Sequence, residues 1–295
     1  MKKYRIITTA GAILALAVSL QAQPSAHYVP GSEGVKGASL PPPGWYLRDY
    51  NLVYYATHLN GPSGQKVPPS NFEALTYANV PRVIWITDTK FLGGYLGVDA
   101  LVPLLYQHLE AGGYNSGTFG VGDFFAEGTL SWHLKQFDFS VGSGVWAPTG
   151  DSPTMPGPSV RPGLGYWSFM QTAGATWFVD SAKTWAVSAL NRYEFNTQQR
   201  DTHATYGQAY TMEWGVSKTL AKVVDVGAVG YYQQQVTANT GPVASRHDRV
   251  AAVGPEVSIA FPKPMLFISC RYDYEFMAEG RAQGQTTTLT VTKRF

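Results

Sequence analysis

The last two segments of the chain alternate between apolar and polar residues. In Met265–Phe276 one set of alternate positions is apolar or aromatic, and the other set includes Arg271, Asp273 and Glu275. Gln285–Phe295 then runs to the end of the sequence and stops on an aromatic residue. A period of two with one apolar face and a terminal aromatic residue is typical of strands in an outer-membrane β-barrel, where lipid-facing and lumen-facing residues alternate. The pattern therefore predicts an all-β fold and a membrane location together.

The composition agrees with a barrel. Hydrophobic residues make up 44% of the chain and aromatic residues 14%, whereas charged residues make up only 14%, against roughly 25% in soluble proteins. The formal net charge of +2 gives no reason to expect a nucleic-acid partner. The single cysteine, Cys270, excludes an intramolecular disulfide, and its place on the apolar face predicts contact with lipid.

The first residues of the chain predict export. Lys2, Lys3 and Arg5 precede the apolar run Ile6–Leu20, and Leu20-Gln21-Ala22 offers a cleavage point before Gln23. This order is that of a secretory signal peptide covering residues 1–22. The alternative, a membrane anchor helix, needs about 20 apolar residues and this run is shorter. We expect cleavage near Ala22 and transfer to the cell outer membrane of a Gram-negative bacterium.

The rest of the chain divides into two parts. Residues 23–43 are rich in glycine, proline and serine and predict a periplasmic tail or a small plug, and residues 44–295 predict an antiparallel up-and-down transmembrane β-barrel. Twelve strands are expected, an even number, which brings both ends of the barrel to the periplasmic side. Their predicted spans are 44–58, 71–87, 93–108, 119–134, 137–147, 165–179, 184–196, 206–219, 223–236, 247–261, 265–277 and 285–295.

The connections between these strands alternate in predicted length. The odd-numbered ones are long and should be extracellular: 59–70, 109–118, 148–164, 197–205, 237–246 and 278–284. The even-numbered ones are short and should be periplasmic: 88–92, 135–136, 180–183, 220–222 and 262–264. Long outer loops and short inner turns are the rule in such barrels.

The charged faces of the strands should point into the lumen. A lysine or arginine facing lipid at mid-depth costs about 2–4 kcal/mol. The resulting lumen or substrate-path candidates are Asp123, Glu127, Arg192, Glu194, Gln233, Gln235, Glu256, Arg271, Asp273 and Glu275. Two interpretations stay open: these groups line a pore that selects cations or neutral polar solutes, or they form a salt-bridged filling that stiffens a narrow barrel.

The proline-rich connection 148–164 is the longest one. It could fold into the mouth as a constriction or hydrophobic capture site, helped by Trp146 and Trp167, or it could be a surface loop. The six histidines are scattered, and no catalytic or metal-ligand spacing is visible. We therefore expect no enzyme activity, no metal and no cofactor.

Five stretches resemble one known family. They are Phe119–His133, Ala147–Asp151, Gly230–Thr237, Val250–Glu256 and Arg271–Gln285. Taken in order, they are similar to the outer-membrane proteins of the MetA-pathway of phenol degradation family, a transporter-like group. The resemblance covers residues 44–295 and implies a barrel that passes hydrophobic or aromatic compounds.

Our first functional hypothesis is an outer-membrane channel for passive uptake of small hydrophobic, including aromatic, compounds. The alternatives are a general porin-like or structural barrel without a dedicated substrate, and a lipid-modifying enzyme of the outer membrane. The expected partners are outer-membrane lipids, the solute, and the outer-membrane assembly machinery, which would bind the terminal Phe295.

Overall fold

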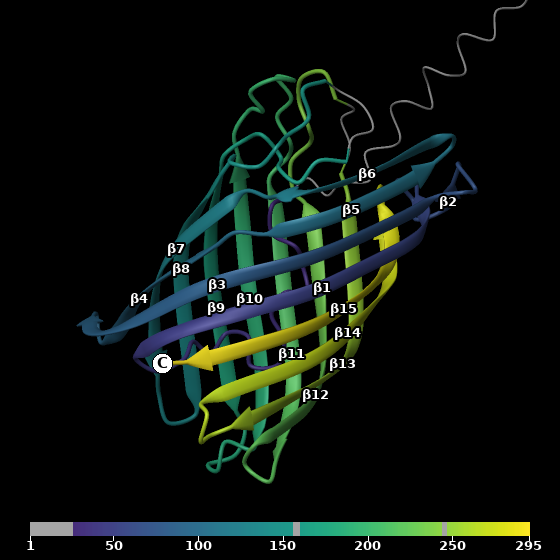
Figure 1. Cartoon of the computed structure of the whole chain (residues 1–295). Coiled ribbons are helices and arrows are strands. Elements are labelled where there is room, and N and C mark those ends of the chain that lie inside the picture. Colours follow the sequence, from purple (N-terminus) through teal and green to yellow (C-terminus); the bar gives the residue numbers. More distant parts are fainter. Residues whose placement is uncertain (1–25, 156–159, 244–246) are drawn as a thin grey trace, which may run out of the picture.

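A closed barrel of antiparallel strands is the only sheet among the described residues of the computed structural model, which are 26–155, 160–243 and 247–295 (Figure 1). The predicted signal peptide and its cleavage site near Ala22 lie outside these residues. Within the described part of the chain, no helix is long and apolar enough to cross a membrane.

Fifteen strand elements build the wall. They are β1 (Gly44–Asn60), β2 (Lys66–Val67), β3 (Glu73–Phe91), β4 (Gly94–Leu101), β5 (Leu104–Ala111), β6 (Tyr114–Val121), β7 (Phe124–His133), β8 (Phe137–Ala147), β9 (Ser168–Phe178), β10 (Trp185–Asn196), β11 (Ala209–Leu220), β12 (Val224–Gln235), β13 (Arg249–Phe261), β14 (Leu266–Glu279) and β15 (Ala282–Arg294). β4 and β5 are two halves of one crossing, as are β6 and β7, and β2 is a short addition beside the end of β1. The predicted antiparallel barrel of twelve strands is confirmed.

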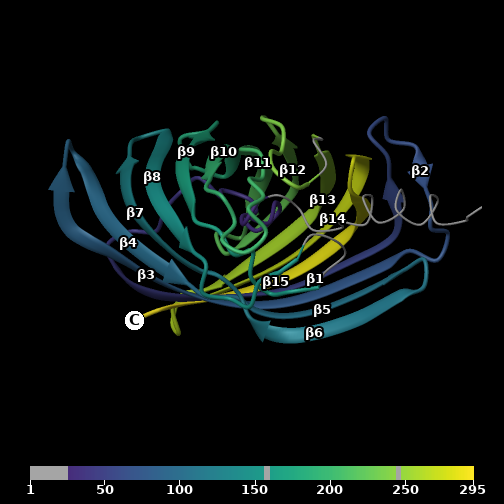
Figure 2. The same cartoon turned by 90° about the horizontal axis from the view of Figure 1, so that it is seen from above.

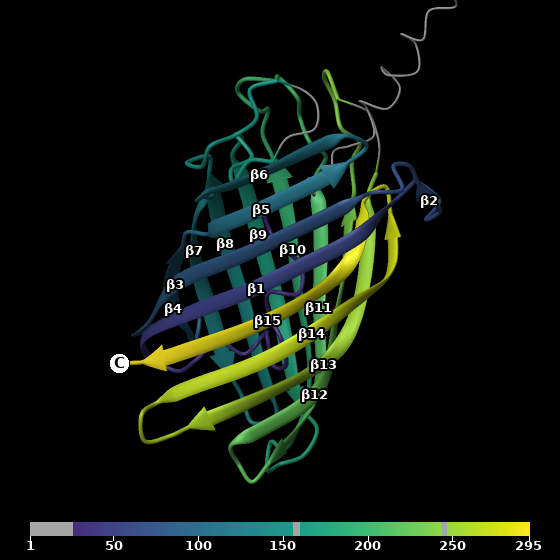
Figure 3. The same ribbon diagram turned by 45° about the vertical axis from the view of Figure 1, so that its right-hand side comes forward.

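The barrel closes where β1 pairs with β15 on one edge and with β3 on the other. Tyr46 lies opposite Arg294 and, on the other side, Trp45 stacks on Trp85 with ring centroids 5.0 Å apart. The backbone N–H of Phe295 donates to Trp45 O at 3.0 Å, so the terminal residue is fixed to the first strand. Figure 2 shows the closed ring from above, and Figure 3 shows the steep tilt of β1, β15 and β14.

Alternation along each strand sets which side chains meet lipid. On β8 the apolar Phe139 and Val141 are exposed outward, whereas Asp138 and Ser140, at the alternate positions, are buried inside. On β14 the same parity puts Arg271 inside and its neighbours outside. In a barrel all backbone groups are paired between strands, so a wall of this kind is stable in hydrocarbon.

Two of the predicted long connections are wrong. Connection 109–118 is a two-residue turn at Gly112 and Gly113, and connection 278–284 is a turn at Gly280 and Arg281. Gly112, Gly113 and Gly280 have φ values of 58°, 91° and 66°. Glycine adopts positive φ at little cost, which lets the strands continue into a tight hairpin. The long connections that remain gather at one end of the barrel, called the loop end below, and the opposite end is called the turn end.

The barrel wall offers a direct test of its lipid-facing surface. Val141 is 43% exposed near the middle of β8 and lies opposite Leu130 and Ala173. We predict that Val141→Lys lowers the free energy of unfolding in liposomes by about 2–4 kcal/mol, because the ammonium group would enter hydrocarbon. The control Val141→Leu should change it by less than about 1 kcal/mol. Equal effects in urea unfolding would contradict the outward placement.

Candidate functional site

The interior of the barrel is occupied by the chain itself. Residues 26–43, named the lumen segment here, run inside the wall and lead into β1 at the turn end (Figures 1 and 2). Tyr28, Glu33 and Ala38 are exposed by only 8%, 7% and 0%. Ser140 donates to Ala38 O at 2.9 Å, while Ala38 N donates to Ser188 Oγ at 3.1 Å. These contacts place the lumen segment inside the barrel.

Two lumen carboxylates bind the backbone of the lumen segment. Glu194 accepts hydrogen bonds from His27 N at 2.9 Å and from Tyr28 N at 2.7 Å. Glu213 accepts from Glu33 N at 3.0 Å and from the Tyr28 hydroxyl at 2.6 Å. Hydrogen bonds to a charged acceptor are the stronger kind. These carboxylates therefore anchor the lumen segment to β10 and β11.

A second anchor lies across the lumen on β13 and β14. Glu256 accepts from Val35 N at 2.9 Å, and Arg271 donates to Ser32 O at 3.0 Å. Arg271 also forms ion pairs with Glu256 at 3.3 Å and with Asp273 at 3.2 Å. The predicted salt-bridged group is thus present in the lumen, and it holds another part of the chain.

Glu33 links the lumen segment to β1 and β3. Its carboxylate pairs with Arg48 at 2.9 Å and Arg82 at 3.0 Å, and accepts from the Tyr50 hydroxyl at 2.8 Å. Burial by itself would raise the pKa of Glu33, but the guanidinium groups of Arg48, Arg82 and Arg192 outweigh it and lower the pKa to about 2. Glu33 is therefore ionised at any pH that a bacterium meets.

The remaining amide and carboxylate candidates form hydrogen bonds with other inward-facing groups near the loop end. Gln233 donates to Tyr28 O at 3.0 Å, and Gln235 donates to Asn239 Oδ1 at 2.7 Å. Glu275 accepts from the hydroxyl groups of Tyr54 at 3.1 Å and Tyr231 at 3.0 Å. Thr172 donates to Glu127 Oε1 at 2.7 Å, and Arg82 lies 3.6 Å from the same carboxylate. All four candidates face inward.

His27 lies in a chain of polar groups that the sequence did not reveal. Its Nε2 is 3.0 Å from Asp123 Oδ2, and its Nδ1 is 2.8 Å from Ser168 Oγ. Ser168 donates its own hydroxyl hydrogen to Asn196 Oδ1 at 2.6 Å and is fully buried. A nucleophilic serine must reach its substrate, and Ser168 is fully buried. The geometry is that of a fixed anchor.

A cavity of about 260 Å³ lies above the lumen segment, on the side of β1, β3 and β5. Its apolar lining includes Leu52, Ala78, Val80, Leu105, Phe125 and Met170. Its polar lining includes Tyr50, Tyr54, Arg82, Glu127 and Glu275. Phe125 and Met170 pack with Tyr28 and Trp146, so the lumen segment supplies the floor. Concave, largely apolar spaces with a few polar groups are the usual form of small-molecule sites.

The predicted site residues divide between cavity and anchor. Those that line the cavity are Asp123, Glu127, Arg192, Glu275 and Trp146. Those placed away from it, among the anchors of the lumen, are Glu194, Gln233, Gln235, Glu256, Arg271 and Asp273.

Trp146 and Trp167 do not act together at the mouth. Trp146 is 6% exposed and stacks on His27 with ring centroids 5.3 Å apart. Trp167 is 47% exposed on the outer side, because it shares the outward parity of Phe169 rather than that of Ser168. Its prediction as part of a mouth site was wrong.

Sequence reasoning missed the most connected cavity residues. Arg82 lies in β3, where the pattern shows no clean alternation, and it pairs with Asp99 at 2.8 Å as well as with Glu33. His27 and Tyr28 fall in a segment without strand periodicity. The charge of Arg82 between apolar neighbours was the one available signal, since an arginine on a barrel strand must face inward.

Comparison with known proteins identifies the family of this chain. No curated protein matches the chain in sequence. The family model described as "Putative MetA-pathway of phenol degradation" matches residues 58–291. The chain belongs to this family.

Solved structures share the fold. This family member is similar to the crystal structure of an outer-membrane channel from Pseudomonas putida F1, with a TM-score of 0.77 and 14% identity over 91% of this chain and 100% of that one. It is also similar to the translocator domain of the autotransporter NalP from Neisseria meningitidis, with a TM-score of 0.50 and 13% identity over 88% and 91% of the two chains. Both are outer-membrane β-barrels, and this chain shares their fold.

The anchoring role of Glu33 gives a pH-dependent prediction. Because its pKa is lowered from 4.5 to about 2, its stabilisation is complete above pH 4.5 and is lost as the pH falls toward 2. We predict that Glu33→Gln costs roughly 3 kcal/mol at neutral pH. The difference from wild type, measured by unfolding of the refolded barrel, should shrink below pH 4.5. The control Glu110→Gln, next to the Gly112–Gly113 turn, removes a carboxylate that lies outside the lumen anchors and should cost less than Glu33→Gln at neutral pH.

Proposed function

We propose that this family member is an outer-membrane channel for the passive uptake of small hydrophobic compounds, aromatic ones included. The observation that carries the proposal is the largely apolar cavity toward the loop end, which is lined on one side by the lumen segment. In this proposal the long connections face the medium and the short turns face the periplasm, which is the usual orientation of such barrels.

The lining of the cavity supports this class of solute. Ala78, Val80 and Leu105 give a stretch of wall without hydrogen-bonding side chains, and Tyr50 and Arg82 lie beside it on β1 and β3. At about 260 Å³ the cavity is smaller than the roughly 300–1,000 Å³ of drug-sized sites. A compact ring with one polar substituent matches both its volume and its mixed apolar and polar lining.

The occupied lumen disfavours the general porin. A porin needs a continuous aqueous path, whereas Glu194, Glu213 and Glu256 hold the lumen segment across this barrel. A lipid-modifying enzyme is disfavoured because Ser168, the serine beside His27, is fully buried and out of reach of a lipid substrate. Recognition of Phe295 by the assembly machinery belongs to the proposal, and the exposed ring of that residue, 71% accessible, is compatible with it.

Filling the cavity tests the site. Ala78 is 7% exposed and lines the cavity from β3. We predict that Ala78→Trp reduces the rate of uptake of a radiolabelled aromatic compound about tenfold or more, because the indole would occupy the space. The control Ala100→Trp adds the same group on β4 at a position of outward parity and should leave uptake unchanged.

Deletion of the gene tests the function itself. A deletion strain should grow more slowly on an aromatic carbon source at low concentration, and the wild-type gene should restore growth. The Ala78→Trp gene should not restore it, although the protein reaches the membrane. Normal growth of the deletion strain on every aromatic compound tested would contradict the proposal.

A further inference from the structure

Lysines gather at the turn end of the barrel. Every hairpin at this end carries a lysine in its turn or within two residues of it, and two more lysines lie near the ends of β11 and β15. Together these residues are named the lysine belt here, and they are Lys90, Lys135, Lys183, Lys218, Lys222, Lys263 and Lys293. In the described part of the chain, only Lys36 and Lys66 lie outside the belt.

The chain does not neutralise the charge of this belt. Among the lysines of the described residues, only Lys36 forms an ion pair, with Asp225 at 2.8 Å inside the lumen. Of the other carboxylates near these turns, Asp180 accepts from two backbone N–H groups of its own hairpin, at 2.9 and 2.7 Å. Asp138 is buried on the lumen side, and Asp88 is exposed. The belt therefore presents an excess of positive charge.

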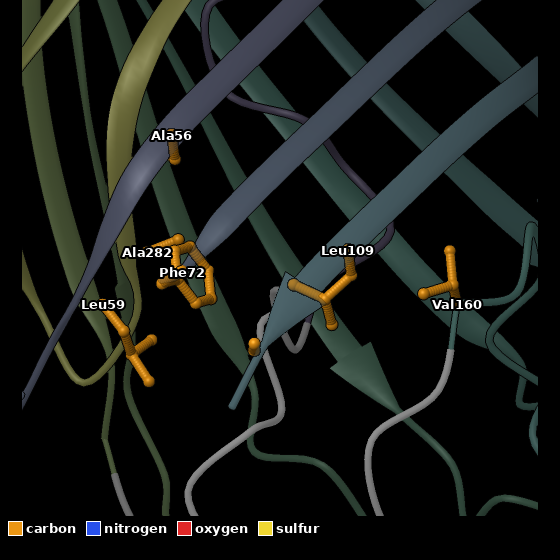
Figure 4. Close-up of a cluster of buried hydrophobic side chains, with 7 residues drawn as sticks. Ala56, Leu59, Phe72, Leu109, Val160 and Ala282 are labelled. Carbon is orange, nitrogen blue, oxygen red and sulfur yellow. The ribbon is translucent and has the colours of Figure 1, made fainter. Parts of the chain in front are cut away.

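The loop end is built differently. Its mouth is filled by a buried apolar cluster that includes Val160 (Figure 4). Two exposed arginines at this end are paired within the chain, Arg249 with Glu279 at 2.6 Å and Arg161 with Asp151 at 2.6 Å. Ion pairs thus cover exposed arginines at the loop end, whereas the belt ammonium groups have no carboxylate partner among the described residues.

The ammonium group of Lys218 lies beside an aromatic ring of the outer face. Its Nζ donates to Thr184 Oγ1 at 2.6 Å and lies 5.0 Å from the centroid of the Trp185 ring. Trp185 is 46% exposed on the outer face, and tryptophan on a barrel exterior concentrates where hydrocarbon meets the headgroups. An ammonium group has three hydrogen-bond donors, so the bond to Thr184 leaves donors for a ligand at headgroup level.

Lys293 repeats this arrangement on β15. It shares the outward parity of Leu289 and Phe295, which are 43% and 71% exposed. Its Nζ donates to Pro264 O and lies 5.9 Å from the centroid of the Phe295 ring. Lys218 and Lys293 therefore each combine an exposed aromatic ring with an ammonium group that has donors to spare.

Apolar surface continues from both lysines toward the middle of the wall. Val216 lies two positions from Lys218 on β11, pairs with Val187 of β10, and both valines are 39% exposed. On β15, Leu289 continues the outer face that begins at Lys293. Outward side chains of this kind contact acyl chains. Cations next to such a strip match a lipid phosphate with its chains alongside the wall.

We propose that the lysine belt binds anionic glycerophospholipid, with Lys218 and Lys293 each donating to a lipid phosphate and the belt as a whole selecting lipids of net negative charge. Charge complementarity favours this occupant over a zwitterionic lipid, because the belt has no neutralising carboxylate partner among the described residues. The site lies on the outer face at the turn end, so the inference goes beyond the proposed uptake and does not depend on the solute.

Lipid binding by the refolded protein tests the proposal. Native mass spectrometry in a non-ionic detergent would give the affinities for phosphatidylglycerol and for phosphatidylcholine. We predict that wild type prefers phosphatidylglycerol and that Lys218→Gln/Lys293→Gln weakens its binding about tenfold or more, because each lysine near an anionic surface contributes a factor of roughly five. Lys218→Arg/Lys293→Arg keeps the charge and should retain the preference.

A matched control separates the belt from a general effect of charge. Lys66→Gln/Arg200→Gln also removes two cations, both exposed and at the loop end, and should bind phosphatidylglycerol as wild type does. The heat-dependent mobility of each variant on SDS gels shows whether it has folded.

Three results would overturn the proposal. They are equal affinities of wild type for the two lipids, equal losses of affinity in the belt variant and the loop-end control, and tighter binding of lipid A than of phosphatidylglycerol at the same two lysines. The last result would assign the belt to lipopolysaccharide instead. None of the three bears on the uptake of aromatic compounds, which the belt variant should support at the wild-type rate.

Discussion

The buried carboxylates of the lumen need hydrogen-bond donors, and the lumen segment supplies them with its backbone. Glu194, Glu213 and Glu256 each accept at least one backbone N–H from that segment. An unpaired charge in a closed barrel would be strongly destabilising. The same bonds fix the floor of the cavity, because Tyr28 is positioned by Glu194 and Glu213. The shape of the cavity therefore depends on Glu194 and Glu213, two carboxylates that are not part of its lining.

Asp123 connects the lumen segment to connection 148–164. It lies at the break between β6 and β7, and it binds His27 of the lumen segment together with both described ends of connection 148–164. The carboxylate of Asp123 thus holds the lumen segment, connection 148–164 and the break between β6 and β7 relative to one another. Such a position suits a residue that holds connection 148–164 against the lumen segment.

The inward placement of the lumen candidates could be predicted because alternation and the cost of charge in lipid act on every residue of a strand separately. Asp273 and Arg271 are inside for that reason alone. The partners of these groups could not be predicted in the same way. Arg271 binds the carbonyl of Ser32, which is 239 positions away in sequence, and no local pattern in a glycine-rich segment marks such a contact. Gly112 and Gly113 had indicated a loop, although positive φ at both permits a tight hairpin.

The sequence by itself determined the antiparallel barrel and the inward face of the strands that alternate cleanly, because the two sides of a barrel wall impose a period of two on neighbouring residues. Tertiary structure alone decided that residues 26–43 enter the lumen and that Trp167 stays outside it. It also decided that β6 keeps one edge without a strand partner among the described residues. These features depend on which distant groups satisfy one another's charge and hydrogen bonds, and that is settled only when the barrel closes around its own N-terminal segment.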